Sequence, residues 1–376
     1  MKKKFIIVTT APISLYFFSG QIQTLKEIFD VEVVSSSGKL LNNFCESEEI
    51  IGNTVEMKRE ISLINDLKSL FSMVYFFYKN SPDYIHGNTP KAGLISMVSG
   101  WLVRVPKRIY YIHGLRYSGE RGFKRSVLKF MEWTSCAFAT DIFSVSVGVR
   151  EALYEDLITR KKVSLIGYGS INGINLDYFS KKNINDHDVR LKYKIKSSDF
   201  IFGFVGRVVA DKGINELVNS FLKINKIHEN AKLLLVGPYE DNLDPLDLWI
   251  RREIEDNSNI IKLDYQNDVR VFYKIMNVFV FPSYREGLGV SLIEALSMEL
   301  PIITTDTIGC NEVIQNDING ILVPKKSIGK LVEAMQDLIL DKEKCLRLGS
   351  RGREIVSNKY DHDMVCKKTL TAYRNL

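Results

Sequence analysis

Cysteine is scarce in this sequence, with 5 residues among 376. None forms a Cys-x-x-Cys pair or belongs to a histidine-rich cluster, the two patterns typical of structural zinc. The spacing therefore argues against a zinc site and a disulfide framework, and predicts reduced thiols in the cytoplasm. The cysteines are Cys45, Cys136, Cys310, Cys345 and Cys366.

Long apolar runs are also missing. No run reaches the roughly 18 residues that a membrane-spanning helix needs, and the nearest, Met73–Tyr78, is far shorter. The apolar stretch after the N-terminal lysines is broken by Pro12 and Ser14 and has no small-residue cleavage site. We therefore expect a first β-strand there and no signal peptide. A GxxxxGK[ST] motif is absent as well, which excludes a P-loop NTPase.

The chain consists largely of short β-branched runs that alternate with amphipathic helical stretches. Its length fits two domains, and the alternation predicts βαβ units with parallel sheets. In the first half we expect strands at 5–10, 31–35, 83–86, 108–113, 141–145 and 163–166, with helices at 90–103 and 124–139. In the second half we expect strands at 200–205, 232–236, 260–263, 278–281 and 301–305, with a helix at 214–227.

A polar segment rich in Lys, Asn and Asp separates the two halves at residues 181–199. We place the domain boundary near 170–195, with domains at 1–175 and 176–358. The predicted fold class is α/β, with two Rossmann-like domains that face each other across a cleft. In open α/β sheets ligands bind at the carboxyl ends of the strands.

The net charge of +6 is unevenly distributed. Residues 1–180 hold 22 basic and 17 acidic side chains, a net charge of +5, and the remainder holds 29 and 28. We call residues 101–130 the basic–aromatic stretch, because eight basic residues alternate there with aromatic ones and with one acid, Glu120. Its composition suits an anionic membrane surface, a nucleic acid or a solvated basic face.

The first motif that points to chemistry runs from Gly206 to Gly213, between a predicted strand and a predicted helix. Arg207 and Lys212 would stand at the carboxyl end of the strand, close to a helix N-terminus. Two fixed cations in that place could clamp a diphosphate. Taken alone the motif is weak, because surface Arg and Lys beside a turn are common.

The second motif, Phe281–Ala295, is a strand end, a turn and the start of a helix. Gly287 and Gly289 let the backbone approach a ligand closely, and amide groups there can hold its oxygens. Glu286 could accept hydrogen bonds from sugar hydroxyls, and Glu294 from a vicinal diol such as ribose. Glu294 has apolar neighbours, so its charge needs a partner or a ligand.

In order and spacing these elements resemble the family-4 glycosyltransferases of the GT-B fold. The resemblance rests on Gly206-Arg207, Lys212-Gly213, Glu286 with Glu294 eight residues later, Pro301–Asp306, Tyr111-Ile112-His113-Gly114 and Leu165–Asn175. The last of these segments is similar to the linker of a subgroup that builds bacterial capsule, O-antigen and other lipid-linked oligosaccharides.

The resemblance implies a retaining transfer from a nucleotide sugar without a metal or other cofactor. Arg207 and Lys212 would hold the diphosphate, Glu286 the donor sugar, and Glu294 the ribose. The backbone from Gly287 through Leu288 and Gly289 to Val290 would complete the donor site. From the N-terminal domain, His113 and Gly20 would reach the donor; the glycine-rich loop of the family is reduced here to Ser19-Gly20-Gln21. The catalytic candidates are thus His113, Glu286, Arg207 and Lys212. No Asp-x-Asp motif follows a predicted strand to hold a metal.

The same analogy suggests that helix 359–376 packs back on the N-terminal domain, which would be the acceptor side. The expected donor is a UDP-sugar, with an N-acetylhexosamine or related amino sugar, and the expected acceptor is a polyprenyl-diphosphate-linked saccharide. With such an acceptor, the basic–aromatic stretch would bind the inner face of the cell membrane, not a nucleic acid. Arg116, Arg121, Lys124 and Arg125 are the candidate contacts.

Other functions stay open on the sequence. A GT-B protein of different chemistry, such as a nucleotide-sugar epimerase or a phosphorylase, would share the fold. A non-catalytic carbohydrate-binding protein would tolerate loss of Lys212 or Glu286. The Gly-rich run 167–173 superficially suggests a dinucleotide site, but its third glycine is one place late and no βαβ unit starts there.

Overall fold

The computed structural model describes residues 2–58, 60 and 62–376. The chain forms two compact units: the first holds the residues up to Gly173 together with His362–Leu376, and the second holds Ile174–Asp361. The C-terminal helix α14 (His362–Arg374) belongs to the first unit, where its Tyr373 ring lies 5.7 Å from that of Phe5. Residues far apart in the sequence thus share one core.

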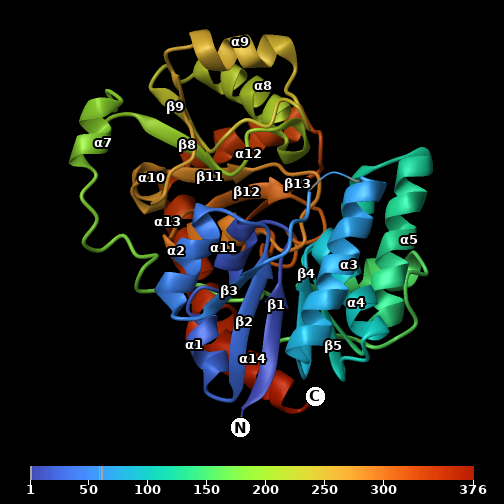
Figure 1. Cartoon of the computed structure of the whole chain (residues 1–376). Helices are drawn as coiled ribbons and strands as arrows, with labels where there is room; N and C mark the ends of the chain where they lie inside the picture. The colour runs from blue at the N-terminus through green and yellow to red at the C-terminus, as the bar shows by residue number, and fades with distance from the viewer. Residues whose placement is uncertain (1, 59, 61) are drawn as a thin grey trace. The chain divides into compact units, whose positions relative to one another are not determined.

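The first unit is built around a seven-stranded parallel sheet of order β3-β2-β1-β4-β5-β6-β7. The neighbours β1 and β4 mark the point where the strand order reverses (Figure 1). Its strands are β1 (Lys3–Val8), β2 (Phe29–Ser35), β3 (Ile51–Thr54), β4 (Tyr84–Asn88), β5 (Lys107–Ile112), β6 (Asp141–Ser144) and β7 (Val163–Leu165). Its helical segments, besides α14, are η1 (Pro12–Phe18), α1 (Gln21–Lys26), α2 (Lys39–Glu48), α3 (Leu63–Asn80), α4 (Pro90–Leu102), η2 (Arg116–Gly119), α5 (Gly122–Phe138) and α6 (Val147–Glu155).

The second unit repeats this plan with a six-stranded parallel sheet of order β10-β9-β8-β11-β12-β13. Here the order reverses between β8 and β11. The strands are β8 (Phe200–Val205), β9 (Ala231–Val236), β10 (Ile260–Leu263), β11 (Val278–Phe281), β12 (Ile302–Thr305) and β13 (Gly320–Val323). The helical segments are α7 (His187–Lys192), η3 (Ala210–Lys212), α8 (Ile214–Asn225), α9 (Leu248–Asp256), α10 (Arg270–Ile275), α11 (Val290–Ser297), α12 (Ile328–Leu340) and α13 (Lys342–Lys359).

The central strands are apolar throughout because both faces of each sheet are covered. All four residues of β11 are buried, and five of the six in β8. Parallel strands packed on both sides read as continuous hydrophobic runs, which is why the sequence predicts them well. The two parallel sheets confirm the predicted α/β class with two Rossmann-like domains.

Two strands were not predicted, β3 and β13, and each lies at the edge of its sheet. Three of the four residues of β3 are exposed, so the strand buries too little to show an apolar pattern. The polar connector at 181–199 contains one short helix, α7, with no buried residue.

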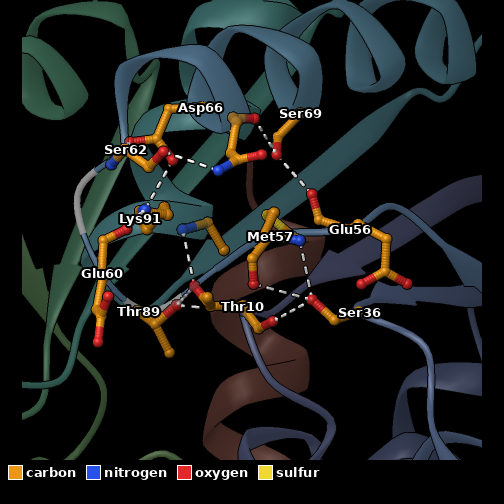
Figure 2. A network of polar contacts seen from close by, with 12 residues as sticks. Thr10, Ser36, Glu56, Met57, Glu60, Ser62, Asp66, Ser69, Thr89 and Lys91 are labelled. Carbon is orange, nitrogen blue, oxygen red and sulfur yellow. Dashed lines mark hydrogen bonds and ion pairs between the residues drawn. The ribbon is translucent and has the colours of Figure 1, made fainter.

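Polar side chains fill the carboxyl edge of the first sheet where its strand order reverses (Figure 2). The hydroxyls of Thr10, after β1, and Thr89, after β4, lie 2.7 Å apart, and the Thr10 hydroxyl accepts from the backbone N–H of Ala92 in the first turn of α4. Ser36, after β2, donates to the Thr10 carbonyl. Lys91 pairs with Asp66 at 2.7 Å. These contacts join the ends of β1 and β2 to the start of α4, and Lys91 joins α4 to α3.

Candidate functional site

The cations of the first motif and the carboxylate of the second follow adjacent strands in the second unit. Arg207 and Lys212 come after β8, and Glu286 comes after β11. These are the two strands between which the order of the sheet reverses. In open α/β sheets this is where ligands bind, so the topology brings the predicted residues to the expected edge.

A glycine turn holds Lys212 against the end of β11. Gly213 has φ +71° and ends η3, and a Cβ atom there would lie 2.1 Å from the Pro282 carbonyl oxygen. Only glycine tolerates both the left-handed backbone and this approach. The result is an ion pair between Lys212 and Glu286, whose side chains are only 15% and 14% exposed. The Lys212 ammonium also lies 5.0 Å from the Phe281 ring centroid.

The two arginines that follow β8 and β11 are also paired with carboxylates. Arg207, 48% exposed, pairs with Glu240, and Arg285 pairs with Asp211 at 2.8 Å. Such surface pairs contribute little to stability, so an anionic ligand could exchange for the carboxylates at low cost. The arrangement is suited to a diphosphate, whose oxygens form bidentate contacts with Arg.

The turn 286–290 is supported from the next strand. Gly309, with φ +79°, packs against it, and a Cβ there would lie 2.8 Å from the Gly287 carbonyl oxygen. Gly289 donates to the Gly309 carbonyl and precedes α11, which begins at Val290. Among the described residues no side chain caps this helix. The positive end of its dipole is therefore directed at the turn that contains Leu288.

Glu294 is the fifth residue of α11 and is half-buried. The Tyr273 hydroxyl of α10 donates to its carboxylate at 2.8 Å. Burial raises the pKa of Glu294 to about 7, and the hydrogen bond from Tyr273 opposes this shift. Tyr273 is therefore a partner of the Glu294 carboxylate, for which we expected a partner or a ligand. We did not predict Tyr273, because a single tyrosine in a short helix forms no recognisable sequence pattern.

His113 and Gly20 lie in the first unit. His113 follows β5, where it stacks on Phe17 at a ring distance of 5.5 Å and contacts Asn88 at 3.0 Å. Gly20 precedes α1 with φ +77°, and its amide donates to Glu48 at 2.8 Å. Both residues lie after strands of the first sheet.

The basic and aromatic residues of the basic–aromatic stretch lie in several elements, and only some of them are exposed. Arg116 lies in η2, and Arg121, Lys124 and Arg125 lie at the start of α5. Lys124 pairs with Glu120 at 2.7 Å and Arg125 with Asp156 at 3.3 Å, so at least two of these four positive charges are locally compensated. Among the aromatic residues, Trp101, Phe123 and Phe130 are exposed, whereas Tyr110, Tyr111 and Tyr117 belong to the core.

Sequence reasoning missed a second exposed surface, on α3. Its outward side chains recur at helical spacing, and Phe71 is 69% exposed. We call this surface the α3 apolar face; it consists of Leu63, Ile64, Leu67, Phe71, Tyr75 and Tyr78. Figure 1 shows α3, α4 and α5 side by side. No helix in the described part of the chain is long and apolar enough to cross a membrane.

Two family models match the chain, one in each half. Residues 8–146 match the model described as "Glycosyl transferase 4-like", and residues 186–355 match "Glycosyl transferases group 1". The second match contains the predicted donor-site residues Arg207, Lys212, Glu286 and Glu294.

Curated relatives match over most of their length. The "Capsular polysaccharide biosynthesis glycosyltransferase CapM" of Staphylococcus aureus is 36% identical over 99% of this chain and 97% of its own. An Escherichia coli relative, "UDP-Gal:alpha-D-GlcNAc-diphosphoundecaprenol alpha-1,3-galactosyltransferase", is 26% identical over 84% of this chain and 81% of its own.

Solved structures share the fold at lower identity. The Anabaena protein HepE, solved in complex with UDP and glucose, aligns over 100% of both chains with a TM-score of 0.81 and 15% identity. The lipopolysaccharide glycosyltransferase WaaG aligns over 97% of this chain and 98% of its own with a TM-score of 0.74 and 15% identity. Together with the relatives, these matches show that the chain belongs to the GT-B family-4 glycosyltransferases of polysaccharide biosynthesis.

Proposed function

We propose that this glycosyltransferase moves a sugar from a UDP-sugar to a lipid-diphosphate-linked saccharide, with retention of the anomeric configuration and without a metal. The observation that carries the proposal is the placement of Arg207, Lys212 and Glu286 at the ends of β8 and β11. This places two cations and a carboxylate at the edge of the sheet where a nucleotide diphosphate would bind.

The chemistry needs stabilisation of the leaving group. Cleavage of the glycosyl–phosphate bond leaves negative charge on the diphosphate, and preorganised cations stabilise that charge effectively. In this proposal Arg207 and Lys212 perform this task in place of a metal, and the dipole of α11 assists them. Glu286 and the backbone from Gly287 to Val290 hold the donor sugar.

The names of relatives support the substrate classes. The Escherichia coli relative acts on a GlcNAc-diphosphoundecaprenol. The "N,N'-diacetylbacillosaminyl-diphospho-undecaprenol alpha-1,3-N-acetylgalactosaminyltransferase" of Campylobacter jejuni is 24% identical over 82% of this chain and 81% of its own. We infer a lipid-diphosphate-linked acceptor for this chain, and an N-acetylhexosamine or related amino sugar in its donor.

The first unit would supply the acceptor side. His113 and Gly20 would contact the donor from there, and the exposed basic residues of η2 and α5 would bind the anionic inner face of the cell membrane. The α3 apolar face adds side chains that favour the lipid boundary. We thus propose that the protein is cytoplasmic and peripheral on the membrane.

UDP is expected to protect the purified protein against heat. At a hundredfold excess over Kd, a ligand stabilises the folded state by about 2.7 kcal/mol. We expect roughly 5–10 °C of increase in Tm, unchanged by EDTA. A panel of UDP- and GDP-sugars with a lipid-diphosphate-linked monosaccharide would then identify the donor, and NMR of the product would give its configuration. An inverted product, or activity lost with EDTA, would contradict the proposal.

Tyr273→Phe is expected to weaken donor binding. The variant removes a hydrogen bond to Glu294 worth about 1.5 kcal/mol, so KM for the donor should rise roughly 10-fold. The hydrogen bond lowers the pKa of Glu294, so its loss should raise that pKa. Because the ionised carboxylate binds the ribose, the pH midpoint for donor binding should then move to higher pH. The measurement is the UDP dissociation constant between pH 6 and 8, which should fall with rising pH in both proteins.

A matched control exists in the first unit. Tyr110 donates to the buried Glu132 at the same distance of 2.8 Å, so Tyr110→Phe removes an equivalent bond that does not involve Glu294. Equal KM values for Tyr273→Phe and Tyr110→Phe would refute the role of Tyr273 in placing Glu294.

A further inference from the structure

Four polar side chains form a continuous chain of hydrogen bonds inside the first unit. The Tyr373 hydroxyl of α14 lies 2.6 Å from His86 Nε2, and His86 Nδ1 lies 2.8 Å from Asn88 Nδ2. Asn88 Oδ1 lies 3.0 Å from His113 Nε2. The parallel register of β4 and β5 explains the last contact, because Asn88 pairs with Tyr111 and His113 lies two residues beyond it. The proposed donor contact, His113, is therefore the end of a network that reaches the C-terminal helix.

Backbone carbonyls fix the orientation of the Asn88 amide. Its Nδ2 lies 3.0 Å from the carbonyl oxygen of His86 and 3.5 Å from that of Val8. Carbonyl oxygens only accept hydrogen bonds, so the NH2 group must face them. The opposite, carbonyl end of the amide must then face His113.

This orientation assigns the protons on both imidazoles. The Asn88 NH2 group donates to His86 Nδ1, so that nitrogen carries no hydrogen and His86 Nε2–H donates to Tyr373. Asn88 Oδ1 can only accept, so His113 must donate from Nε2. The remaining nitrogen of a neutral His113, Nδ1, is then the acceptor.

The packing around the network supports a single arrangement. His86 is fully buried and Asn88 is 1% exposed. Phe18 meets the His86 ring edge-on at 5.6 Å, and Tyr111 stacks on it at 5.6 Å. Burial lowers the pKa of His86 to about 3 and that of His113 to about 4. Both rings are therefore neutral near pH 7, as the proton assignment requires.

We propose that Asn88 is a positioning residue, which holds His113 as its Nε2–H tautomer and thereby presents Nδ1 as an acceptor to a hydroxyl of the donor sugar. The proposal rests on the proposed function, in which His113 reaches the donor. Tyr373 and His86 hold Asn88 in turn, so the C-terminal helix contributes to the same site from within the first unit. Replacing Asn88 would leave His113 free to change tautomer or to rotate.

The test begins with the wild-type protein labelled with 15N at histidine. The chain has 5 histidines, and the signals that disappear in His113→Ala are those of His113. We expect the His113 signals of a neutral ring with hydrogen on Nε2 from pH 6 to 8. In Asn88→Asp the new carboxylate should favour the imidazolium, and the protonation midpoint of His113 should rise by about one to three pH units. Asn88→Ala should give mixed tautomers and lower kcat/KM about 10- to 100-fold, mainly through kcat, because a misplaced group weakens contacts made in the transition state.

Asn319→Ala is the matched control for a merely structural loss. Asn319 is also buried, and its side chain bonds the Val313 carbonyl and the Gln315 amide in the second unit. It should leave the His113 signals and kcat unchanged. Hydrogen on His113 Nδ1 in the wild type would overturn the positioning proposal whatever the activity, and so would an unaltered His113 spectrum in Asn88→Asp. A wild-type protein that gains no protection from UDP would instead refute the proposed function.

Discussion

Replacing Lys212 with alanine is expected to lower kcat about 100- to 1000-fold. The loss has the size found when one preorganised group that stabilises a developing negative charge is removed. Lys212 is held by the Gly213 turn, by Glu286 and by the Phe281 ring, so its ammonium would need little reorganisation as the diphosphate leaves. The measurement is steady-state transfer from the UDP-sugar that the panel identifies, with lipid-linked acceptor at saturation.

The stability of the variant must be separated from its activity. Lys212→Ala leaves Glu286 largely buried without its ion partner, which destabilises the fold. The double variant Lys212→Ala/Glu286→Ala removes that penalty and should recover Tm but not activity. Lys344→Ala is the matched control, because Lys344 is 19% exposed and pairs with Asp337 at 2.8 Å in the same unit. Full activity of the double variant would show that residues other than Lys212 and Glu286 stabilise the leaving group.

The placement of the candidate donor residues at one edge of the sheet could be predicted because these residues follow central strands. Strands such as β8 and β11 are buried on both faces and therefore show clearly in the sequence, and side chains just after them must meet at one edge. Arg207, Lys212 and Glu286 were found in this way. What the sequence could not show is the pairing of each charge, such as Arg285 with Asp211 or Glu294 with Tyr273, because these contacts join segments whose spacing has no pattern.

The network behind His113 illustrates a second limit. His86 and Asn88 are two residues apart in a buried strand, so their polar side chains lie on the same face of the sheet. This pattern could have indicated a functional role from the sequence. Its meaning depends on Tyr373, 285 positions after Asn88, and the fold alone brings that residue into the first unit. Local pattern predicts which strand carries a polar group, and only tertiary packing supplies its partners.

The basic–aromatic stretch shows why composition misjudges surfaces. Tyr110, Tyr111 and Tyr117 are core residues. Composition alone does not distinguish such buried tyrosines from tyrosines exposed at a membrane surface. Conversely, the apolar residues of α3 suggest a buried helix, yet only three of its residues, Ser69, Met73 and Phe77, are buried. The exposed membrane-facing candidates therefore include the α3 apolar face as well as the start of α5.

Removing charge from α5 is expected to release the protein from anionic membranes. Each basic residue near such a surface contributes about 1 kcal/mol, so Arg121→Gln/Lys124→Gln/Arg125→Gln should lower binding to vesicles that contain phosphatidylglycerol by up to about 100-fold. The carboxylates paired with Lys124 and Arg125 reduce that figure. Phe71→Glu/Tyr75→Glu on the α3 apolar face should weaken binding as well, through lost apolar burial and added repulsion, and its effect should persist at high salt.

Two comparisons make this prediction specific to membrane docking. Lys223→Gln/Lys226→Gln/Lys330→Gln removes the same charge from exposed positions of the second unit and should leave vesicle binding unchanged. Activity on a lipid-linked acceptor should fall in the α5 and α3 variants, while activity on a short soluble analogue stays near the wild-type value, because the donor residues lie elsewhere. Equal losses on both acceptors, or equal losses of vesicle binding in the second-unit variant, would show that these surfaces do not dock the enzyme to its lipid substrate.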